Sequence, residues 1–450
     1  MPRPALWIVT IGCALSFVFL FLTHKRFDRS FFIDGKVYYA AANLFAHGRD
    51  PYDGAALIAE SLHADPAGYP AGTAGELYIN LPAALLPAAA VSFLPWTAFT
   101  TLSLVLMAFS IPLIVVFGLT ATGVDVTRGR LVGLSILLAA YPPVWRCMMT
   151  GQVAILICAV CLGVCACVER RRSPARLWGA AAFTFLALTK VTCAVPLLVY
   201  LFVRSARQER MALTAGASVF VAACLVVTVM IGPHAAVSGL RENQAITFGP
   251  AGPDYPYFAP AKFARIDLEP LLAMFVGAPR LAAVKYGLCL LLFLPLLVWT
   301  IKNGPGVDAR LASAWLAFSL ILFYHRSYDA LMTAPILFLG IRDLVDGARV
   351  LGSVRIALFL AGYLLLGDHN IFSVLAHAGV QDQAWIRPTL FIALYASAFP
   401  WSTVPTPARS SVRPGLGKRA PREDLPKREG KEKAPAPKAN LSRPSGWVND

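Results

Sequence analysis

The chain has 450 residues, of which 57% are hydrophobic and only 14% charged, and its formal net charge is +15. Soluble globular domains carry about 25% charged residues, so this composition excludes an ordinary soluble domain and favours a membrane protein. A basic chain is also typical of nucleic-acid binding, but basic cytoplasmic loops explain the charge better, and we expect no nucleic-acid partner.

The first apolar run, from Ala5 to Thr23, approaches the roughly 20 residues of a helical span. It exceeds the roughly 7–15 residues of a signal-peptide core, and no small-residue cleavage site follows it. We therefore interpret it as a retained first transmembrane helix. The cysteines lie mostly inside apolar runs, where a thiol behaves as a small hydrophobic group. The sequence predicts neither a disulfide framework nor a metal site.

A polar stretch over 24–78, rich in Gly, Pro, Asp and Tyr, follows the first run. The next uncharged stretch is broken by prolines in its first half, so we interpret 79–94 as an interfacial segment and 96–120 as the second span. Further apolar runs lie at 131–146, 152–168, 178–189, 191–203, 211–231, 279–301, 311–324, 330–345, 352–366 and 385–401.

Charge indicates how these runs cross the membrane, because short loops rich in Arg and Lys remain cytoplasmic. Arginine clusters at 170–176 and 204–210 flank the segment 178–203, so this segment must enter and leave on the same side. It is too short for two complete spans of about 20 residues. The sequence therefore predicts two half-depth helices that meet near Lys190, an arrangement tolerated where broken helices line a cavity.

With this break, the charge rule predicts an all-α polytopic bundle of about twelve membrane segments with both termini cytoplasmic, in the inner (plasma) membrane. We expect a transmembrane domain over 1–401 that includes extracytoplasmic loops at 24–78 and 232–278. A disordered basic cytoplasmic tail should follow over 402–450, since this stretch is rich in Pro, Lys and Glu and poor in aromatic residues.

The same topology gathers polar groups at the extracytoplasmic face of an apolar bundle. Titratable groups at a membrane are costly and usually functional. Asp34 is open to two interpretations: a helix N-cap, or a partly desolvated carboxylate whose raised pKa suits a general base. The other groups at this face are Gly151-Gln152, Lys190, His325-Arg326-Ser327-Tyr328-Asp329 and Asp368-His369.

These other groups also keep two interpretations each. Gln152 begins an apolar run and could bond lipid headgroups or a substrate. Lys190 could extend its ammonium to the interface or bind a phosphate. The turn from His325 to Asp329 could be a simple connection, yet it offers two potential cations, a hydroxyl, a phenol and a carboxylate. Asp368-His369 is more typical of a helix-capping loop than of a metal site.

Taken together, several motifs resemble those of glycosyltransferase family 87. The resemblance covers about residues 1–400, and the tail has no counterpart in it. The chain departs from the family pattern at three points, where Leu81, Val191 and Ala154 stand in place of Pro, Pro and Asn. The motifs that carry the resemblance are Asp34 with Val37-Tyr38-Tyr39-Ala40-Ala41, Gly48, Pro51-Tyr52-Asp53, Tyr78-Ile79-Asn80-Leu81-Pro82, Gly151-Gln152-Val153, Lys190 and the His325–Asp329 turn.

The resemblance implies a GT-C fold, a polyprenyl-phosphate sugar donor carrying mannose or arabinose, and a glycolipid or polysaccharide acceptor. It implies an inverting transfer with Asp34 as general base. It requires no cofactor, although a divalent metal is compatible with it. The residues that it assigns to the donor phosphate are Lys190, His325 and Arg326. Those that it assigns to substrate binding are Tyr38, Tyr39, Gln152, Tyr328 and Asp329.

Two other functions stay open at this point. A lipid or solute transporter or flippase would also use broken helices, but its polar groups should lie near the bilayer midplane between repeats, and no internal repeat is evident. A non-catalytic membrane assembly factor would need none of these polar groups. Replacement of Asp34 should separate the three functions, because only an enzyme would lose turnover.

Overall fold

The computed structural model describes residues 3–24, 31–65, 77–169, 173–248, 250, 265–302, 306–323, 325–366 and 385–399. Across these residues the secondary structure is helical, apart from one isolated bridge between Arg265 and Arg326. The predicted all-α class is therefore confirmed. The expected tail at 402–450 and the Asp368-His369 pair lie outside the described residues.

Five helical segments are long and apolar enough to cross a membrane, or up to six if one bent pair counts as a single span. The bent pair is α6 (Arg128–Ala139) with α7 (Pro142–Thr150), which meet at 61° where two consecutive prolines interrupt the helical hydrogen bonds. The expected number of twelve segments stays a prediction. The five are α1 (Arg3–His24), α5 (Trp96–Ala121), the joined α9 (Pro174–Ala187) and α10 (Val191–Arg204), α11 (Arg207–Ile231) and α15 (Ala278–Lys302).

The remaining helices are shorter. Three of them are apolar: α8 (Ala154–Glu169), α16 (Ala309–Leu322) and α20 (Ile386–Ala398). The expected interfacial segment at 79–94 is indeed broken, into η1 (Pro82–Ala84) and α4 (Leu85–Ala89). The others are α2 (Ile33–Ala46), α3 (Gly54–Ala64), α12 (Pro233–Phe248), α14 (Leu268–Leu272), η3 (Ser327–Thr333), α17 (Ala334–Val345) and α18 (Arg349–Leu365).

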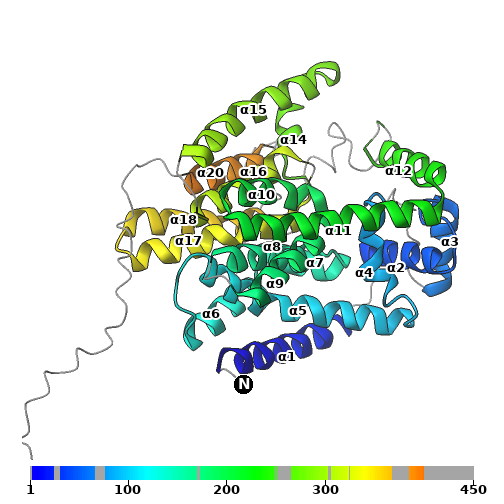
Figure 1. Ribbon diagram of the computed structural model, residues 1–450, viewed down its shortest axis with the longest axis horizontal. Coiled ribbons are helices and arrows are strands. Elements are labelled where there is room, and N and C mark those ends of the chain that lie inside the picture. The colour runs from blue at the N-terminus through cyan, green and yellow to red at the C-terminus, as the bar shows by residue number, and fades with distance from the viewer. Residues whose placement is uncertain are drawn as a thin grey trace, which may run out of the picture. The chain divides into compact units, whose positions relative to one another are not determined.

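The helices run between two ends, which Figure 1 shows as the α2, α3 and α12 group on one side and the α17–α18 turn on the other. We call them the α2 end and the basic end. At the basic end, Arg204 Nε donates to the carbonyl of Gly306 at 2.9 Å, which joins the last residue of α10 to the chain just before α16. Basic residues at helix ends on this side are Arg128, Arg130, Arg176, Arg204, Arg207, Arg210, Lys302, Arg310, Arg342 and Arg349.

The chain reverses direction between α9 and α10. A Cβ on Gly179 of α9 would lie 3.3 Å from the sulfur of Cys167, and one on Gly163 would lie 2.9 Å from the ring of Phe183. As α9 advances, it therefore moves toward the beginning of α8, so these two helices are antiparallel.

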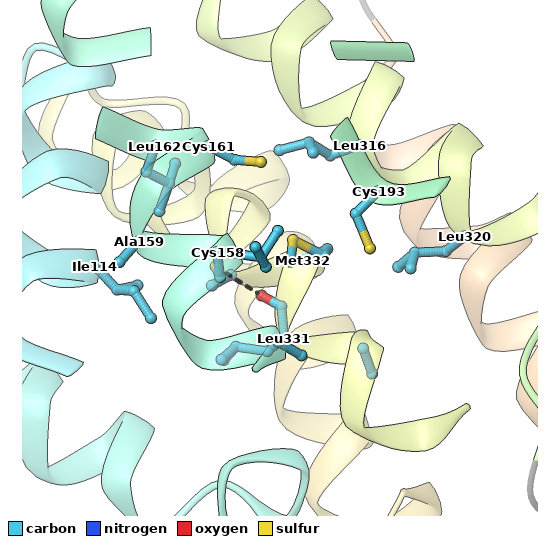
Figure 2. Close-up of a cluster of buried hydrophobic side chains, with 14 of the residues drawn as sticks. Ile114, Cys158, Ala159, Cys161, Leu162, Cys193, Leu316, Leu320, Leu331 and Met332 are labelled. Atoms are coloured by element: carbon cyan, nitrogen blue, oxygen red, sulfur yellow. Dashed lines mark hydrogen bonds between the residues drawn. The ribbon is translucent and has the colours of Figure 1, made fainter. Parts of the chain in front are cut away.

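Along α10 the order is the opposite. Cys193, near its start, lies in the same cluster as Cys158 and Cys161 of α8 (Figure 2). Tyr200, one turn before its end, is within electrostatic range of Cys165. Thus α9 runs toward the start of α8, and α10 runs back toward the end of α8. The 3₁₀ turn η2 (Leu188–Lys190) joins the two helices. This agrees with the predicted pair of helices that meet near Lys190, although by length and composition the two together also count as one candidate span.

The core lies around α8, whose residues are buried on nearly every face. Cys158 and Cys161 pack there against Leu316 and Met332 as small apolar groups, as the sequence predicts (Figure 2). The Cys158 thiol also donates to the carbonyl of Leu331 at 3.4 Å. A helix that is apolar all round belongs at the centre of a bundle, so α8 fixes the positions of the helices around it.

Large aromatic side chains remain exposed near the helix ends. At the α2 end, Phe93 is 79% and Phe275 is 77% exposed. Toward the basic end, Trp178 is 76% exposed. Aromatic side chains concentrate where a membrane meets water. Such exposed rings are typical of a chain that contacts a membrane.

Candidate functional site

A cavity of about 610 Å³ opens at the α2 end. Its walls come from α2, the segment before η1, the start of α8, η2, α12, α15 and the turn after α16. Pockets of this size bind small molecules, typically through a few polar groups set in an apolar wall. The polar lining residues are Asp34, Tyr38, Asn80, Gln152, Thr189, Lys190, Thr192, Gln244, Thr247, Lys285, Arg326, Tyr328 and Asp329.

Asp34 is held by a tight junction between the start of α2 and the loop after α7. The amide of Phe32 donates to the carbonyl of Met149 at 2.6 Å, and Phe32 itself adopts a left-handed conformation with φ 60°. Gly151, with φ 77°, lies so close to Gly35 that a Cβ there would be 2.7 Å from the Gly35 nitrogen. The junction places Asp34 in the first turn of α2, where the helix dipole favours a carboxylate.

The Asp34 carboxyl is buried and incompletely paired. Its Oδ2 atom has no hydrogen-bond partner among the described residues. Burial raises the pKa of Asp34, while the charge of Arg326, the side chain of Gln152 and the charge of Lys190 partly oppose that rise. Buried polar atoms without a partner are uncommon and call for an explanation. A carboxylate with one free oxygen and a raised pKa is suited to accept a proton.

On the opposite wall, Lys190 pairs with Asp329. The Lys190 ammonium donates to Oδ1 of Asp329 and lies 5.0 Å from the centre of the Tyr328 ring. The other carboxylate oxygen of Asp329 is 3.0 Å from Nδ1 of His325. Burial alone would raise the pKa of Asp329, but Lys190 and His325 lower it below the ordinary value. Asp329 is therefore ionised and held between two cationic partners.

His325 lies behind this pair rather than in the cavity. Its side chain is fully buried, and it is not among the cavity-lining residues. Burial alone would lower the pKa of His325, yet the Cys193 sulfur and the Asp329 carboxylate raise it to about 9. The imidazole is then protonated at neutral pH, and it acts on the cavity only through Asp329.

Three potential metal ligands, Cys193, His325 and Asp329, lie within 4.8 Å of one another. Both oxygens of Asp329 already accept from protein groups, and the Lys190 ammonium occupies the position of a cation beside it. Asp329 is thus already paired with Lys190 and His325, and we assign no metal to this group.

Among the other predicted site residues, the cavity brings together Tyr38, Gln152, Arg326 and Tyr328 with those described above. Burial raises the pKa of Tyr38 to about 12, so its phenol stays protonated. Tyr39 instead points away: its hydroxyl donates to the carbonyl of Leu94 at 3.0 Å, and its ring packs on neighbouring aromatic groups.

A buried charge network, which the sequence pattern does not predict, lies beside the cavity. Arg265 donates to both oxygens of Asp267, at 2.8 and 2.6 Å, and pairs with Glu269. Lys285 of α15 lies 2.7 Å from Glu269 and also lines the cavity. The amide of Ile266 donates to the carbonyl of His325 at 3.0 Å. This network fixes the segment that carries Arg326.

The helix α12 was also unexpected at the site. Its Asn243 side chain donates to the carbonyls of Tyr52 and Tyr78 at 3.0 and 3.1 Å, which docks α12 on the segments beside α2. The next residue, Gln244, then faces the cavity. The polar face of 233–248 is visible in the sequence, but its partners are about 165 to 190 residues away.

Comparison with protein families gives one match, to the model of glycosyltransferase family 87, over residues 78–324. This is more than half of the chain. The chain belongs to glycosyltransferase family 87. No curated protein and no solved structure matches it. The family and the apolar helices together make it a multi-pass membrane glycosyltransferase, with a membrane environment and lipid-linked substrates indicated.

The match to family 87 covers only part of the site. Gln152, Lys190 and Lys285 fall inside the matched region, whereas Asp34 and Arg326 lie before and after it. The fold brings both outer residues to the same cavity as the matched ones. The cavity therefore combines the family 87 region with the N-terminal helix α2 and the turn after α16.

Proposed function

We propose that this family 87 member transfers a sugar, mannose or arabinose, from a polyprenyl-phosphate donor to a hydroxyl group of an extracytoplasmic glycolipid or polysaccharide. One observation carries the proposal: Asp34, whose Oδ2 has no hydrogen-bond partner among the described residues, lines the same cavity as Lys190 and Arg326. A base and a phosphate-binding cation in one cavity are the two groups that such a transfer needs.

In the proposed reaction, the acceptor hydroxyl gives its proton to Asp34 while its oxygen forms a bond to C1 of the sugar. The bond between C1 and the phosphate oxygen breaks, and its electron pair leaves with the polyprenyl phosphate. The products are the glycoside, the lipid phosphate and a protonated Asp34, which later returns its proton to water. A single displacement of this kind inverts the anomeric carbon.

The leaving phosphate needs charge stabilisation more than it needs a proton. Lys190 and Arg326 both line the cavity, and charge-assisted hydrogen bonds to phosphate are strong. His325, which does not line the cavity, would contribute only through Asp329. The phenols of Tyr38 and Tyr328 and the amide of Gln152 supply neutral groups for the sugar hydroxyls.

The distribution of charge supports an extracytoplasmic active site in the inner membrane. Ten basic residues at helix ends lie at the basic end, whereas two, Arg280 and Arg387, lie at helix starts away from it, and the cavity lies at the α2 end. Short arginine-rich loops remain cytoplasmic, which would place the cavity outside and both ends of the 1–401 domain inside. On the same reasoning, 24–78 and 232–278 are extracytoplasmic loops, and 402–450 is a cytoplasmic tail.

A transporter or flippase fits this arrangement less well, because its polar groups would lie near the middle of the bilayer. Here they line a cavity between α2, α12, η2 and the turn after α16, at the α2 end of the bundle. A scaffold has no use for an unpaired buried carboxylate oxygen, which costs stability.

The test uses the full-length protein in nanodiscs and a panel of radiolabelled polyprenyl-phosphate sugars. We expect Asp34→Asn to reduce transfer at least 1,000-fold, as an order of magnitude for loss of a general base, while donor binding stays within a few-fold of wild type. The matched control is Asp53→Asn. Asp53 caps α3 by accepting from the amides of Ala55 and Ala56 at 2.9 and 3.1 Å, and Asn can replace it there.

Normal transfer by Asp34→Asn would refute the base assignment. Equal losses in Asp34→Asn and Asp53→Asn would mean that the change acts through folding rather than chemistry. If wild type transfers no sugar from any donor in the panel but moves lipid across the bilayer, the transporter interpretation would replace the proposed one.

A further inference from the structure

Lys190 and Asp329 at the cavity wall and His325 behind them form a continuous chain of contacts. His325 Nδ1 is 3.0 Å from one oxygen of Asp329, and the other oxygen accepts from the Lys190 ammonium. Asp329 is 2% and His325 0% exposed. Both are thus fixed by burial, while the Lys190 side chain at the outer end of the chain of contacts keeps 14% exposure.

These contacts leave Lys190 with N–H donors for a ligand, whereas both oxygens of Asp329 already accept hydrogen bonds. An ammonium has three N–H donors, and the described residues give Lys190 one hydrogen bond, to Asp329, besides its approach to the Tyr328 ring. Each oxygen of Asp329, in contrast, already accepts from a protein group. The backbone amide of Asp329 also donates to the carbonyl of Arg326 at 2.9 Å, which fixes the turn itself.

We propose that Asp329 is a positioning residue, not a substrate-binding one: it holds the Lys190 ammonium against the cavity, and His325 fixes Asp329 from behind. This inference rests on the proposed function, since it supposes that Lys190 meets the donor phosphate. A lysine side chain is a flexible four-carbon stem, and Lys190 is the last residue of a 3₁₀ turn, so a fixed partner is needed to direct its charge.

The charges of the three groups also fit this role. An imidazolium, a carboxylate and an ammonium carry a net charge of +1, so the pairing orients Lys190 without cancelling its attraction for an anion. The contact between His325 and Asp329 matters because a carboxylate with only one hydrogen-bond partner can rotate away from that partner. Pre-organised charges that need no rearrangement during the reaction give the largest electrostatic stabilisation.

A double-mutant cycle on the full-length protein in nanodiscs tests the inference. The variants are Lys190→Met, Asp329→Asn and the double variant, and the readouts are kcat and KM with the polyprenyl-phosphate sugar that wild type uses. We expect kcat to fall about 100-fold in Lys190→Met, as for loss of one charge-stabilising donor, and about 10-fold in Asp329→Asn. The double variant should fall no further than Lys190→Met alone, because Asp329 acts only through Lys190.

Multiplied losses, about 1,000-fold in the double variant, would overturn the inference, since Asp329 would then act on the substrate independently. A structural role is detected separately. Asp329→Asn leaves both the Lys190 ammonium and His325 without the carboxylate, whereas the double variant leaves only His325, whose imidazole can lose its proton. The double variant should therefore unfold at a higher temperature than Asp329→Asn alone and keep the low kcat of Lys190→Met. If the double variant regained both stability and kcat, Asp329 would be structural only.

Binding of the sugar-free polyprenyl phosphate separates this inference from the proposed function. If wild type neither transfers sugar nor binds this lipid, both fall. If wild type does both, and Lys190→Met loses binding while Asp329→Asn retains wild-type binding and kcat, the proposed function stands and the positioning role is refuted. Weakened binding in both single variants, with non-multiplied losses, supports the positioning role.

Discussion

At the scale of single residues, the pKa of Asp34 offers a direct test of the site's chemistry, because burial and neighbouring groups shift it in opposite directions. Burial raises its pKa, and Arg326, Gln152, Lys190 and Thr150 all oppose the rise, Arg326 most strongly. The balance leaves a carboxyl group whose pKa is higher than that of an ordinary Asp. The pH dependence of the reaction should therefore respond to those cations.

We predict that Arg326→Gln moves the acid limb of the kcat/KM profile to higher pH. The base must be deprotonated to act, and Arg326 lowers the pKa of Asp34. Without that cation the pKa rises, so activity disappears at a higher pH. The measurement is kcat/KM between about pH 4 and 9. Arg342→Gln, at an exposed pair with Asp346 far from the cavity, serves as control and should leave the limb in place.

Sequence reasoning located several of these side chains but not their partners. Asp34, Gln152, Lys190 and Arg326 were recognisable because charged or amide groups are rare beside apolar runs. The burial of His325 was not recognisable, because a residue in a turn is expected to be exposed and its burial depends on the helices that pack over it.

At the scale of the elements, the junction between α2 and α7 depends on two glycines in close contact. Gly151 has φ 77°, and its missing Cβ would meet the backbone of Gly35 at 2.7 and 2.8 Å. Neither atom can move without displacing α2. The backbone contact thus sets the distance between Asp34 and Gln152.

We predict that Gly151→Ala destabilises the protein by about 2 kcal/mol, from left-handed backbone strain and the clash together, and reduces transfer strongly. Gly133→Ala is the matched control: Gly133 lies inside α6 with open space around it, so Ala should be neutral or stabilising by up to about 1 kcal/mol. Thermal unfolding and turnover of both variants test this. Equal stability of the two would contradict the role given to the junction.

The charge network from Arg265 to Lys285 makes a second prediction for an element, the segment that leads into α14. Asp267 is fully buried and pairs with Arg265 at 2.6 Å and with Lys285 at 3.7 Å. Asp267→Asn leaves two buried cations with only Glu269, and we expect a loss of roughly 3 kcal/mol. The exposed pair of Arg342 and Asp346 offers a control, since Asp346→Asn should cost less than about 1 kcal/mol. Similar unfolding temperatures for the two variants would contradict the prediction.

The elements were predictable to different degrees. The break at Lys190 followed from the flanking arginines, and the breaks at 79–94 followed from prolines. The bend between α6 and α7 was not predicted, although Tyr141-Pro142-Pro143 marks it, because the apolar run continues through those residues. The network at 265–285 could not be found from the sequence, since its partners are paired only by the fold.

For the whole molecule, the arrangement of its two ends predicts a membrane orientation. We expect a cysteine at Glu242, exposed on α12 at the α2 end, to react with a membrane-impermeant maleimide in intact cells. A cysteine at Arg349, exposed at the start of α18 at the basic end, should react only after permeabilisation. The host chain for both has its exposed and half-buried cysteines replaced by Ser. The reverse pattern of labelling would place the cavity in the cytosol and refute the extracytoplasmic assignment.

The aromatic side chains at the α2 end have a further consequence for how reactants arrive. If the exposed rings of Phe93 and Phe275 lie at headgroup depth, a molecule anchored in the same leaflet reaches the cavity by diffusing in two dimensions. The rate at which donor meets the cavity then depends on the mole fraction of donor in that leaflet. Dilution of the donor with inert phospholipid would slow the enzyme, whereas addition of buffer would not.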